Sequence, residues 1–187
     1  MSVDYALQRL GIQAQVTNDI EKIQKADKVI FPGVGEASTT MAYLRKHKLD
    51  EVLRSLKQPV LGICLGMQLM CSHSSENDVD CIGIFDEKVV RFNPEPGMEN
   101  ITKVPHMGWN SIYNTKSNLF DSDIESHYVY FVHSYHACLG EHTIASCDYI
   151  IPFAAAMHKD NFYATQFHPE KSGPVGARIL KNFIEKC

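Results

Sequence analysis

The amino-acid sequence predicts a three-layer α/β sandwich, in which helices cover both faces of a mostly parallel sheet. Apolar runs at residues 28–31 and 59–63 each lead into a turn, and segments with helical periodicity precede and follow them. Strands that alternate with helices favour a parallel sheet, because each helix returns the chain across one face of the sheet. The 187 residues, 44% of them apolar, suffice to bury one core, so we expect a single domain over residues 1–187.

The chain is predicted to open in a helix. Apolar residues recur at helical spacing from Val3 to Leu10, and Gly11 follows as a residue that ends helices. Residues 12–16 alternate like a strand, after which Asn18 or Asp19 can cap a short helix. This short helix is predicted within residues 20–26, and further helices within residues 36–56, 65–71 and 173–187. Short strands in a mixed or partly antiparallel arrangement are predicted within residues 84–167.

Composition and charge argue against several classes of function. The formal net charge of −4 gives no basic field that would attract nucleic acid or an anionic membrane surface. No apolar run approaches the ~20 residues of a membrane span, and the first residues lack the features of a signal peptide, so we expect a cytoplasmic protein. The six cysteines have no paired short spacings, which disfavours disulfides and a thiolate zinc site. We expect neither a metal ion nor a cofactor.

A cysteine stands at the predicted junction of a strand and a helix, in Gly62-Ile63-Cys64-Leu65-Gly66. A nucleophile at such a junction, with glycines two residues before and after it, is typical of a nucleophile elbow. The glycines permit a tight turn, and the start of the helix favours the thiolate form of the cysteine. The alternative is a buried structural cysteine.

Two further segments could complete a catalytic site around Cys64. In Gln166-Phe167-His168-Pro169-Glu170, His168 lies at the end of the last predicted strand, and Glu170 is near enough in sequence to orient its imidazole. Pro32-Gly33-Val34-Gly35 follows another strand and offers unhindered backbone N–H groups to a developing oxyanion. Taken separately, each segment could also be an ordinary surface turn.

Together these segments resemble the class I glutamine amidotransferases, whose members share a PGxG oxyanion loop, a GxCxGxQ elbow and a terminal HPE. The resemblance covers nearly the whole chain and implies a flavodoxin-like sandwich with the active site at the carboxyl ends of the strands. Within the family, the segments that look like the glutaminase subunits of imidazole glycerol phosphate synthases are Gly62 to Gln68, Val104-Pro105-His106-Met107-Gly108-Trp109-Asn110 and Phe131-Val132-His133-Ser134-Tyr135.

The resemblance implies a role for each residue of the site. Cys64, His168 and Glu170 would be catalytic, and ammonia would pass to a separate (β/α)8-barrel cyclase subunit. That subunit would form imidazole glycerol phosphate and aminoimidazole carboxamide ribotide in histidine biosynthesis. The remaining implied residues are Val34, Gly35 and Leu65 for the oxyanion hole, Gly33, Gln68, Glu76, Ser134 and Tyr135 for glutamine, and Trp109, Tyr130 and Lys171 for the interface of the heterodimer.

The resemblance also implies a difference at the start of the chain. Members of the family usually begin with a strand that precedes the helix starting here near Ser2. We therefore expect this strand to be absent from the sheet, leaving a vacancy between the strands at residues 29–31 and 60–63.

Other interpretations of the motifs stay open at this point. The chain could serve another synthase, such as one for anthranilate or pyridoxal phosphate, or be a non-catalytic regulatory partner of the same fold. His133 and His136 could suggest a metal pair, but the alternation of a strand would put them on opposite faces.

Overall fold

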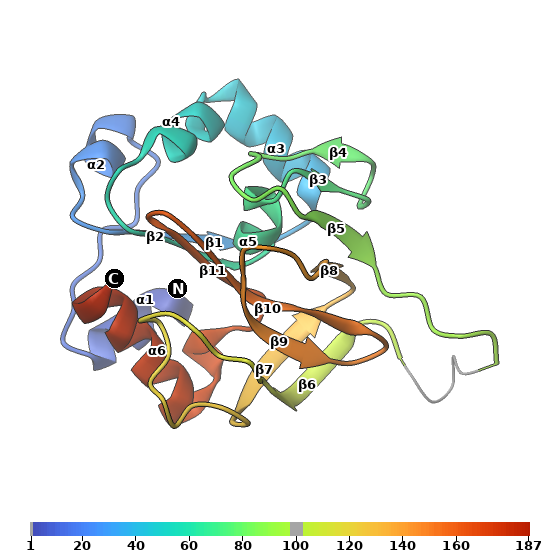
Figure 1. Cartoon of the computed structure of the whole chain (residues 1–187). Helices are drawn as coiled ribbons and strands as arrows, with labels where there is room; N and C mark the ends of the chain where they lie inside the picture. The colour runs from blue at the N-terminus through green and yellow to red at the C-terminus, as the bar shows by residue number, and fades with distance from the viewer. Residues whose placement is uncertain (1, 98–102) are drawn as a thin grey trace.

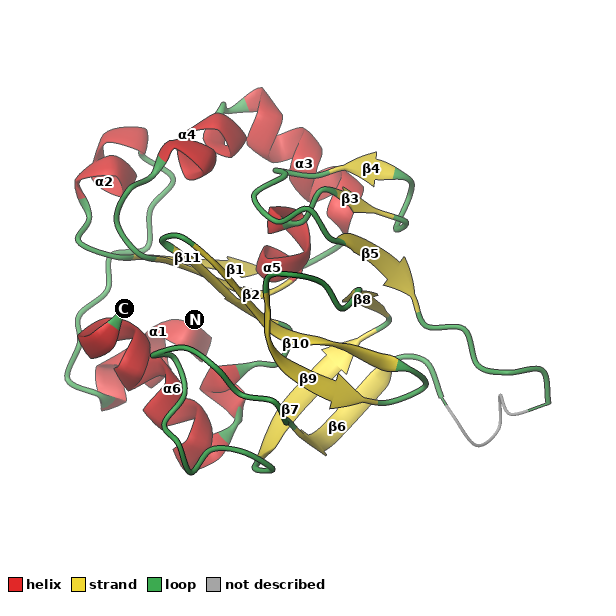
Figure 2. Ribbon diagram, in the orientation of Figure 1, coloured by secondary structure: helices red, strands yellow, loops and turns green. Residues whose placement is uncertain are grey.

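The computed structural model describes residues 2–97 and 103–187 and has three layers, with a five-stranded sheet in the middle (Figure 1). Four helices lie over one face of this sheet, and the first and last helices of the chain lie together over the other face (Figure 2). The helices are α1 (Ser2–Arg9), α2 (Ile20–Lys25), α3 (Ala37–Lys46), α4 (Leu49–Ser55), α5 (Leu65–Met70), the 3-10 helix η1 (Pro169–Lys171) and α6 (Gly173–Lys186). The strands are β1 (Val29–Gly33), β2 (Val60–Cys64), β3 (His73–Ser74), β4 (Val79–Asp80), β5 (Lys88–Arg91), β6 (His106–Ser111), β7 (Tyr128–His133), β8 (Tyr135–Ala137), β9 (Thr143–Asp148), β10 (Pro152–Lys159) and β11 (Phe162–Thr165).

The central sheet has a parallel half and an antiparallel half. Its order is β1-β2-β11-β10-β9, and β2 pairs in parallel with both β1 and β11. β10 is antiparallel to both of its neighbours, which agrees with the mixed arrangement expected for the second half of the chain. Two smaller sheets, β4-β3-β5-β8 and β6-β7, extend beyond it. The three-layer α/β fold is therefore confirmed, and its parallel strands are those that carry the predicted site.

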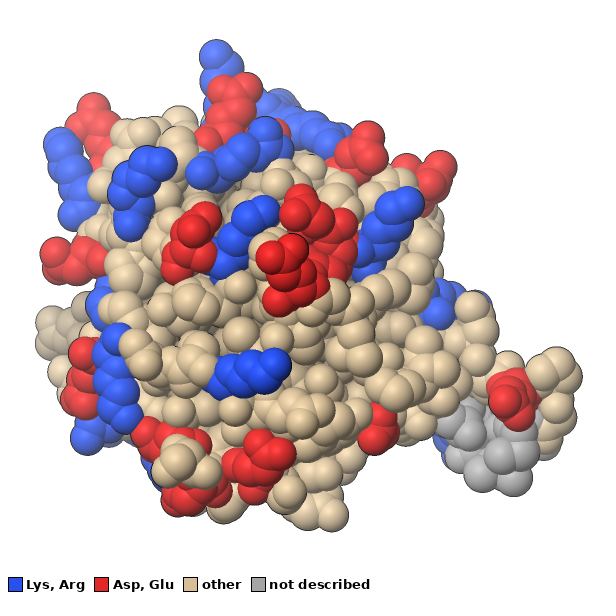
Figure 3. All heavy atoms as spheres, in the orientation of Figure 1, with Lys and Arg blue, Asp and Glu red and all other residues tan. Residues whose placement is uncertain are grey.

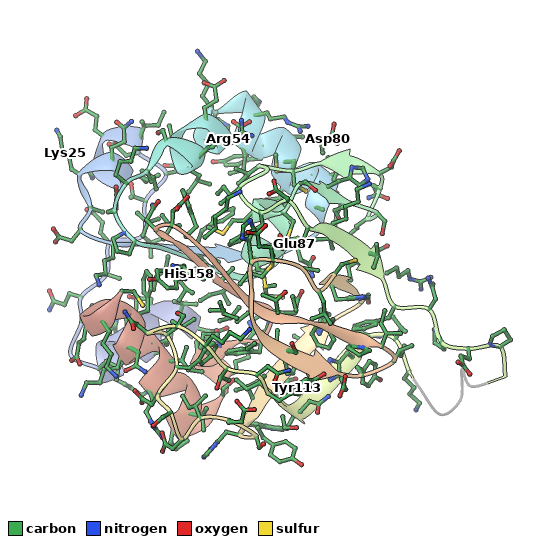
Figure 4. The ribbon with its side chains drawn as sticks, in the orientation of Figure 1. Lys25, Arg54, Asp80, Glu87, Tyr113 and His158 are labelled. Atoms are coloured by element: carbon green, nitrogen blue, oxygen red, sulfur yellow. The ribbon has the colours of Figure 1, made fainter. Side chains whose placement is uncertain are left out.

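Apolar side chains fill the space on both faces of the sheet (Figure 4). On one face, α3, α4 and α5 contribute Met41, Leu53 and Met67 to a cluster of buried residues. On the other, α1 and α6 contribute Ala6 and Phe183 to a second cluster. Burial of such side chains is the main stabilising term in a domain of this size.

Local sequence signals place the helix ends. Asp19 caps α2, because its carboxylate accepts the N–H of Glu21 at 2.9 Å. The end of α6 is held by a long-range contact instead. Lys28, which directly precedes β1, donates from Nζ to the carbonyl of Phe183 at 2.9 Å and to that of Cys187 at 2.5 Å.

Two predictions for the N-terminal part are wrong. Residues 12–16 form no strand, and Val16 is 85% exposed, because alternation alone does not create a strand without a neighbour to pair with and a core to cover. The expected vacancy between residues 29–31 and 60–63 does not exist either. β1 and β2 are directly hydrogen-bonded, from Val29 opposite Val60 to Gly33 opposite Cys64, so their backbone groups satisfy one another.

The surface carries charges of both signs, mixed over the face drawn in Figure 3. No helix within residues 2–97 and 103–187 has the length and apolar character that crossing a membrane requires.

Candidate active site

Cys64 ends β2 and immediately precedes α5, in a backbone conformation that is rare for residues other than glycine. Its φ is 54° and its ψ is −110°. The turn also brings α5 against β1 so closely that a Cβ on Gly66 would lie 1.9 Å from the carbonyl oxygen of Phe31. A Cβ on Gly33 would lie 2.5 Å from the backbone nitrogen of Gly66. The geometry is that of the predicted nucleophile elbow, and these contacts explain why glycine is required.

His168 and Glu170 lie together just after β11. His168 Nδ1 is 2.8 Å from Glu170 Oε1, and the two side chains are only 13% and 4% exposed. The backbone of His168 is fixed on both sides, because its N–H donates to the Tyr130 carbonyl at 2.9 Å and its carbonyl accepts from Ser172 Oγ at 2.7 Å. The imidazole therefore has a defined orientation, with Nδ1 committed to the carboxylate.

The electrostatic surroundings of His168 link it to Cys64. Burial lowers the pKa of His168, but its interactions with Cys64 and Glu170 outweigh this and raise that pKa to about 9. His168 Nε2 is buried and makes no other hydrogen bond among the described residues, while the side chain interacts with Cys64. Because Nδ1 is occupied by Glu170, Nε2 is the nitrogen left to exchange a proton with the Cys64 sulfur.

Two other groups contact the Cys64 sulfur. Sγ lies 3.9 Å from the Val132 carbonyl, and Gln166 Nε2 lies 3.8 Å from Sγ. Gln166 is fully buried, and its Oε1 accepts a hydrogen bond from Gln68 Nε2 at 3.0 Å. Gln166 has no role in the site that the motifs predict. The only signal was an amide next to an otherwise apolar strand end, which does not reveal its partners.

Three of the five residues expected to hold glutamine lie at the elbow or contact α5, which follows it: these are Gly33, Gln68 and Tyr135. Gly33 lies opposite Cys64 across the β1–β2 pair. Gln68 Nε2 donates to the Tyr135 carbonyl at 2.8 Å, at the turn through Ser134 that joins β7 to β8. Glu76 contacts the far end of the loop that follows β1: its Oε2 accepts the N–H of Ala37, the first residue of α3, at 2.8 Å.

The loop expected to form the oxyanion hole follows Gly33 directly. Gly35 has a φ of +95°, which glycine adopts without strain, and Val34 is 89% exposed. The loop ends at Glu36, which caps α3 by accepting the N–H of Thr39 at 2.6 Å. Leu65, the third residue expected in the oxyanion hole, opens α5 directly after Cys64.

The three residues expected at a partner interface lie together on the outer side of the β6–β7 pair. The ring centroids of Trp109 and Tyr130 are 6.0 Å apart, and Lys171 Nζ lies 5.9 Å from the Tyr130 centroid. Trp109 is 55% exposed, and Met107 and Tyr128 are also exposed. We call this patch, formed by Met107, Trp109, Tyr128, Tyr130 and Lys171, the outer aromatic surface.

The other thiols differ from Cys64 in their environment. Burial raises the pKa of all five of them, which are Cys71, Cys81, Cys138, Cys147 and Cys187. A thiol held in its protonated form is a poor nucleophile, so the structure favours Cys64 as the reactive one.

The prediction that His133 and His136 point to opposite faces is wrong. Both rings pack against Phe92 and Phe153, with centroid distances between 4.1 and 5.7 Å. Strand alternation does not apply, because β7 ends at His133 and Ser134 interrupts the chain before β8. Within residues 2–97 and 103–187, no group of three or more His, Cys, Asp or Glu side chains is arranged to hold a metal ion.

Comparisons with known proteins agree with this geometry. The sequence matches the family model described as "Glutamine amidotransferase class-I" over residues 1–187. It is 61% identical to the imidazole glycerol phosphate synthase subunit HisH of Bacteroides fragilis, over 98% of this chain and 92% of that protein. Identity to the HisH of Pasteurella multocida is 47%, over 98% and 91% of the two chains.

Solved structures share the fold at low sequence identity. A structure described as a glutamine amidotransferase gives a TM-score of 0.73 at 19% identity, over 98% of this chain and 91% of that one. A glutamine amidotransferase from Thermotoga maritima gives a TM-score of 0.57 at 18% identity, over 98% and 74% of the two chains. With a family model matched along its whole length, this chain belongs to the class I glutamine amidotransferases.

Proposed function

We propose that this chain is the glutaminase subunit of an imidazole glycerol phosphate synthase, which hydrolyses glutamine to glutamate and ammonia. The observation that carries the proposal is the strained elbow at Cys64 beside the buried His168–Glu170 pair. The relatives named imidazole glycerol phosphate synthase subunit HisH support the choice of synthase, one of them being 61% identical.

The first chemical step forms a thioester. Because the pKa of His168 is raised to about 9, its Nε2 already holds the proton given up by the Cys64 thiol when the sulfur attacks the side-chain carbonyl carbon of glutamine. The tetrahedral intermediate collapses when the C–N bond breaks and His168 returns the proton to the leaving ammonia. Glu170 holds the imidazole with Nδ1 protonated throughout, which the 2.8 Å contact supports.

The second step releases glutamate. A water molecule gives a proton to His168 as its oxygen attacks the thioester carbonyl, and the proton then returns to the departing Cys64 sulfur. In both steps we assign stabilisation of the oxyanion to the N–H groups of Leu65 and of the loop at Val34 and Gly35. Each such donor is worth roughly 2.7–4 kcal/mol in a transition state.

We propose that the outer aromatic surface binds a (β/α)8-barrel cyclase subunit, which receives the ammonia. Exposed aromatic and apolar side chains in one patch are typical of protein interfaces. The patch is also connected with the catalytic residues, because the Tyr130 carbonyl accepts the N–H of His168 at 2.9 Å. Docking at Tyr130 can therefore act on the position of the catalytic histidine.

A glutaminase assay with and without the cyclase tests both parts of this proposal. We expect little glutamate release from the isolated chain and a rise when the cyclase is present with its own ligand bound. The loop at Val34 and Gly35 is the expected switch, because a peptide next to glycine can rotate at small cost. Equal turnover with and without the liganded cyclase would refute the coupling, and no glutamate release under either condition would refute the assignment as a glutaminase.

A further inference from the structure

Three histidines lie in the aromatic core behind the active site, and two of them form a continuous hydrogen-bonded chain. His133 Nδ1 is 2.7 Å from the Tyr135 carbonyl oxygen, and His133 Nε2 is 3.1 Å from His106 Nδ1. His106 Nε2 is in turn 3.4 Å from Asn110 Nδ2. His106 and His133 are 3% and 6% exposed, so these groups have no ready access to water.

The carbonyl at one end fixes every proton along this chain. A carbonyl oxygen only accepts hydrogen bonds, so His133 must carry its proton on Nδ1. Burial lowers the pKa of His133 to about 3 and that of His106 to about 4, so both rings are neutral and each holds one ring proton. His133 Nε2 is then an acceptor, His106 must donate from Nδ1, and His106 Nε2 accepts from Asn110.

This directed chain ends at an atom that also belongs to the active site. The Tyr135 carbonyl accepts a second hydrogen bond from Gln68 Nε2 at 2.8 Å, and Gln68 contacts Gln166, whose amide lies 3.8 Å from the Cys64 sulfur. Ser134 and Tyr135 form the turn expected to hold glutamine. The position of that turn therefore depends on the donor that His133 supplies.

The other end of this hydrogen-bonded chain lies on β6. Alternation along this strand points Met107 and Trp109 outward, into the outer aromatic surface, and His106 and Asn110 inward. Asn110 Nδ2 also donates to the Asp148 carbonyl at 2.8 Å, which anchors the start of the chain on β9. The two histidines thus join the strand that carries Trp109 to the turn at Ser134 and Tyr135.

We propose that His106 and His133 are positioning residues for the glutaminase reaction, which hold the Ser134–Tyr135 turn in its substrate-binding position through a fixed sequence of donors and acceptors. This inference rests on the proposed function. His106 acts only through His133, because its proton on Nδ1 keeps His133 in the tautomer that donates to Tyr135.

The third histidine of the cluster, His136, offers a matched control. His136 is fully buried in the same aromatic cluster and stacks on Phe92 at 4.1 Å, yet neither of its ring nitrogens has a hydrogen-bond partner among the described residues. His136→Phe therefore removes a buried histidine from the same core without touching the chain of donors and acceptors.

The first test compares His106→Phe, His106→Asn and His136→Phe in the complex with the cyclase. His106→Phe keeps a ring but loses the donor, and we expect the KM for glutamine to rise about three- to tenfold with kcat within about twofold, the effect of one net hydrogen bond. His106→Asn restores an N–H near the position of Nδ1 and should bring KM back toward the parent value. His136→Phe should leave KM unchanged.

A rise in KM that is equal for His106→Phe and His136→Phe, or absent for His106→Phe, would overturn the proposal. The second test needs no variant and no activity: nitrogen NMR of the parent protein should show His106 and His133 as neutral rings protonated on Nδ1. A proton on Nε2 of His133 would also overturn it. If the parent complex released no glutamate, the proposed function would fail while the NMR result still decided the state of the chain.

Discussion

Replacing Glu170 by Gln tests how the carboxylate acts on His168. The substitution nearly preserves the size of the side chain and leaves an amide oxygen that can accept from His168 Nδ1, but it removes the negative charge. That charge, with Cys64, raises the pKa of His168 to about 9 against the opposing effect of burial. Without it, the imidazole loses its proton at a lower pH.

The size of the effect follows from the pKa of His168. The rise from 6.5 to about 9 corresponds to about 3 kcal/mol in favour of the protonated ring, at about 1.4 kcal/mol per pH unit. Cys64 and Glu170 share this effect, so loss of the carboxylate charge should lower the pKa by at least about one unit. At pH 8 the protonated fraction of His168 would then fall from about nine tenths to about one half or less.

The assay is the pH dependence of kcat/KM for glutamine in the complex with the cyclase. In the proposed mechanism, His168 must be protonated to deliver a proton to the leaving nitrogen of glutamine, so activity should fall as the pH rises through about 9 in the parent protein. In Glu170→Gln this alkaline fall should begin at least about one pH unit lower. Glu185→Gln, which removes an exposed carboxylate from α6, is the matched control and should leave the profile unchanged. An unchanged alkaline limb in Glu170→Gln would refute the reasoning.

Further predictions follow from the elbow and the outer surface. Cys64→Ser should reduce glutamine hydrolysis more than tenfold without unfolding the chain, which activity and circular dichroism together would check. Iodoacetamide should modify Cys64 first, and mass spectrometry showing faster modification of Cys71 would contradict this order. Gly66→Ala should destabilise the fold by at least about 1–3 kcal/mol in a urea titration, because its Cβ would meet the Phe31 carbonyl oxygen at 1.9 Å. Trp109→Ala should weaken binding of the cyclase by about 2 kcal/mol in a titration, while Cys64 alkylation in the free chain stays at the parent rate.

Those parts of the site that depend on neighbouring residues could be predicted from the sequence. The elbow is one example, because its glycine–cysteine–glycine pattern lies within five consecutive residues, and the structure shows the turn at Cys64 with a φ of 54°. The pairing of His168 with Glu170 is another, since only Pro169 separates them. The parallel orientation of β1 and β2 was likewise indicated by two apolar runs that alternate with helices, but their direct pairing was not predicted.

Features that depend on distant residues could not be predicted in this way. Residues 12–16 have the alternation of a strand, but a strand also needs a partner, and β1 lies at the edge of the sheet with β2 as its one neighbour among the described residues. The expected vacancy failed for the same reason, because the sequence does not state which strands become adjacent. His133 and His136 share one cluster because β7 ends at His133 and Ser134 separates it from β8. Regular strand alternation does not predict such an interruption.

Gln166 and His133 show what a sequence leaves hidden about an active site. Both stand within segments that the motifs pick out, yet the motifs assign neither of them a role in catalysis or in binding glutamine. Both become visible once burial is known, because most buried polar groups have a hydrogen-bond partner that can be looked for. The partners of Gln166 include the Cys64 sulfur, and those of His133 include the Tyr135 carbonyl. Tracing each buried donor to its acceptor therefore identifies residues of the site to which the motifs assign no role. We expect substitution of such positioning residues to change the KM for glutamine more than kcat.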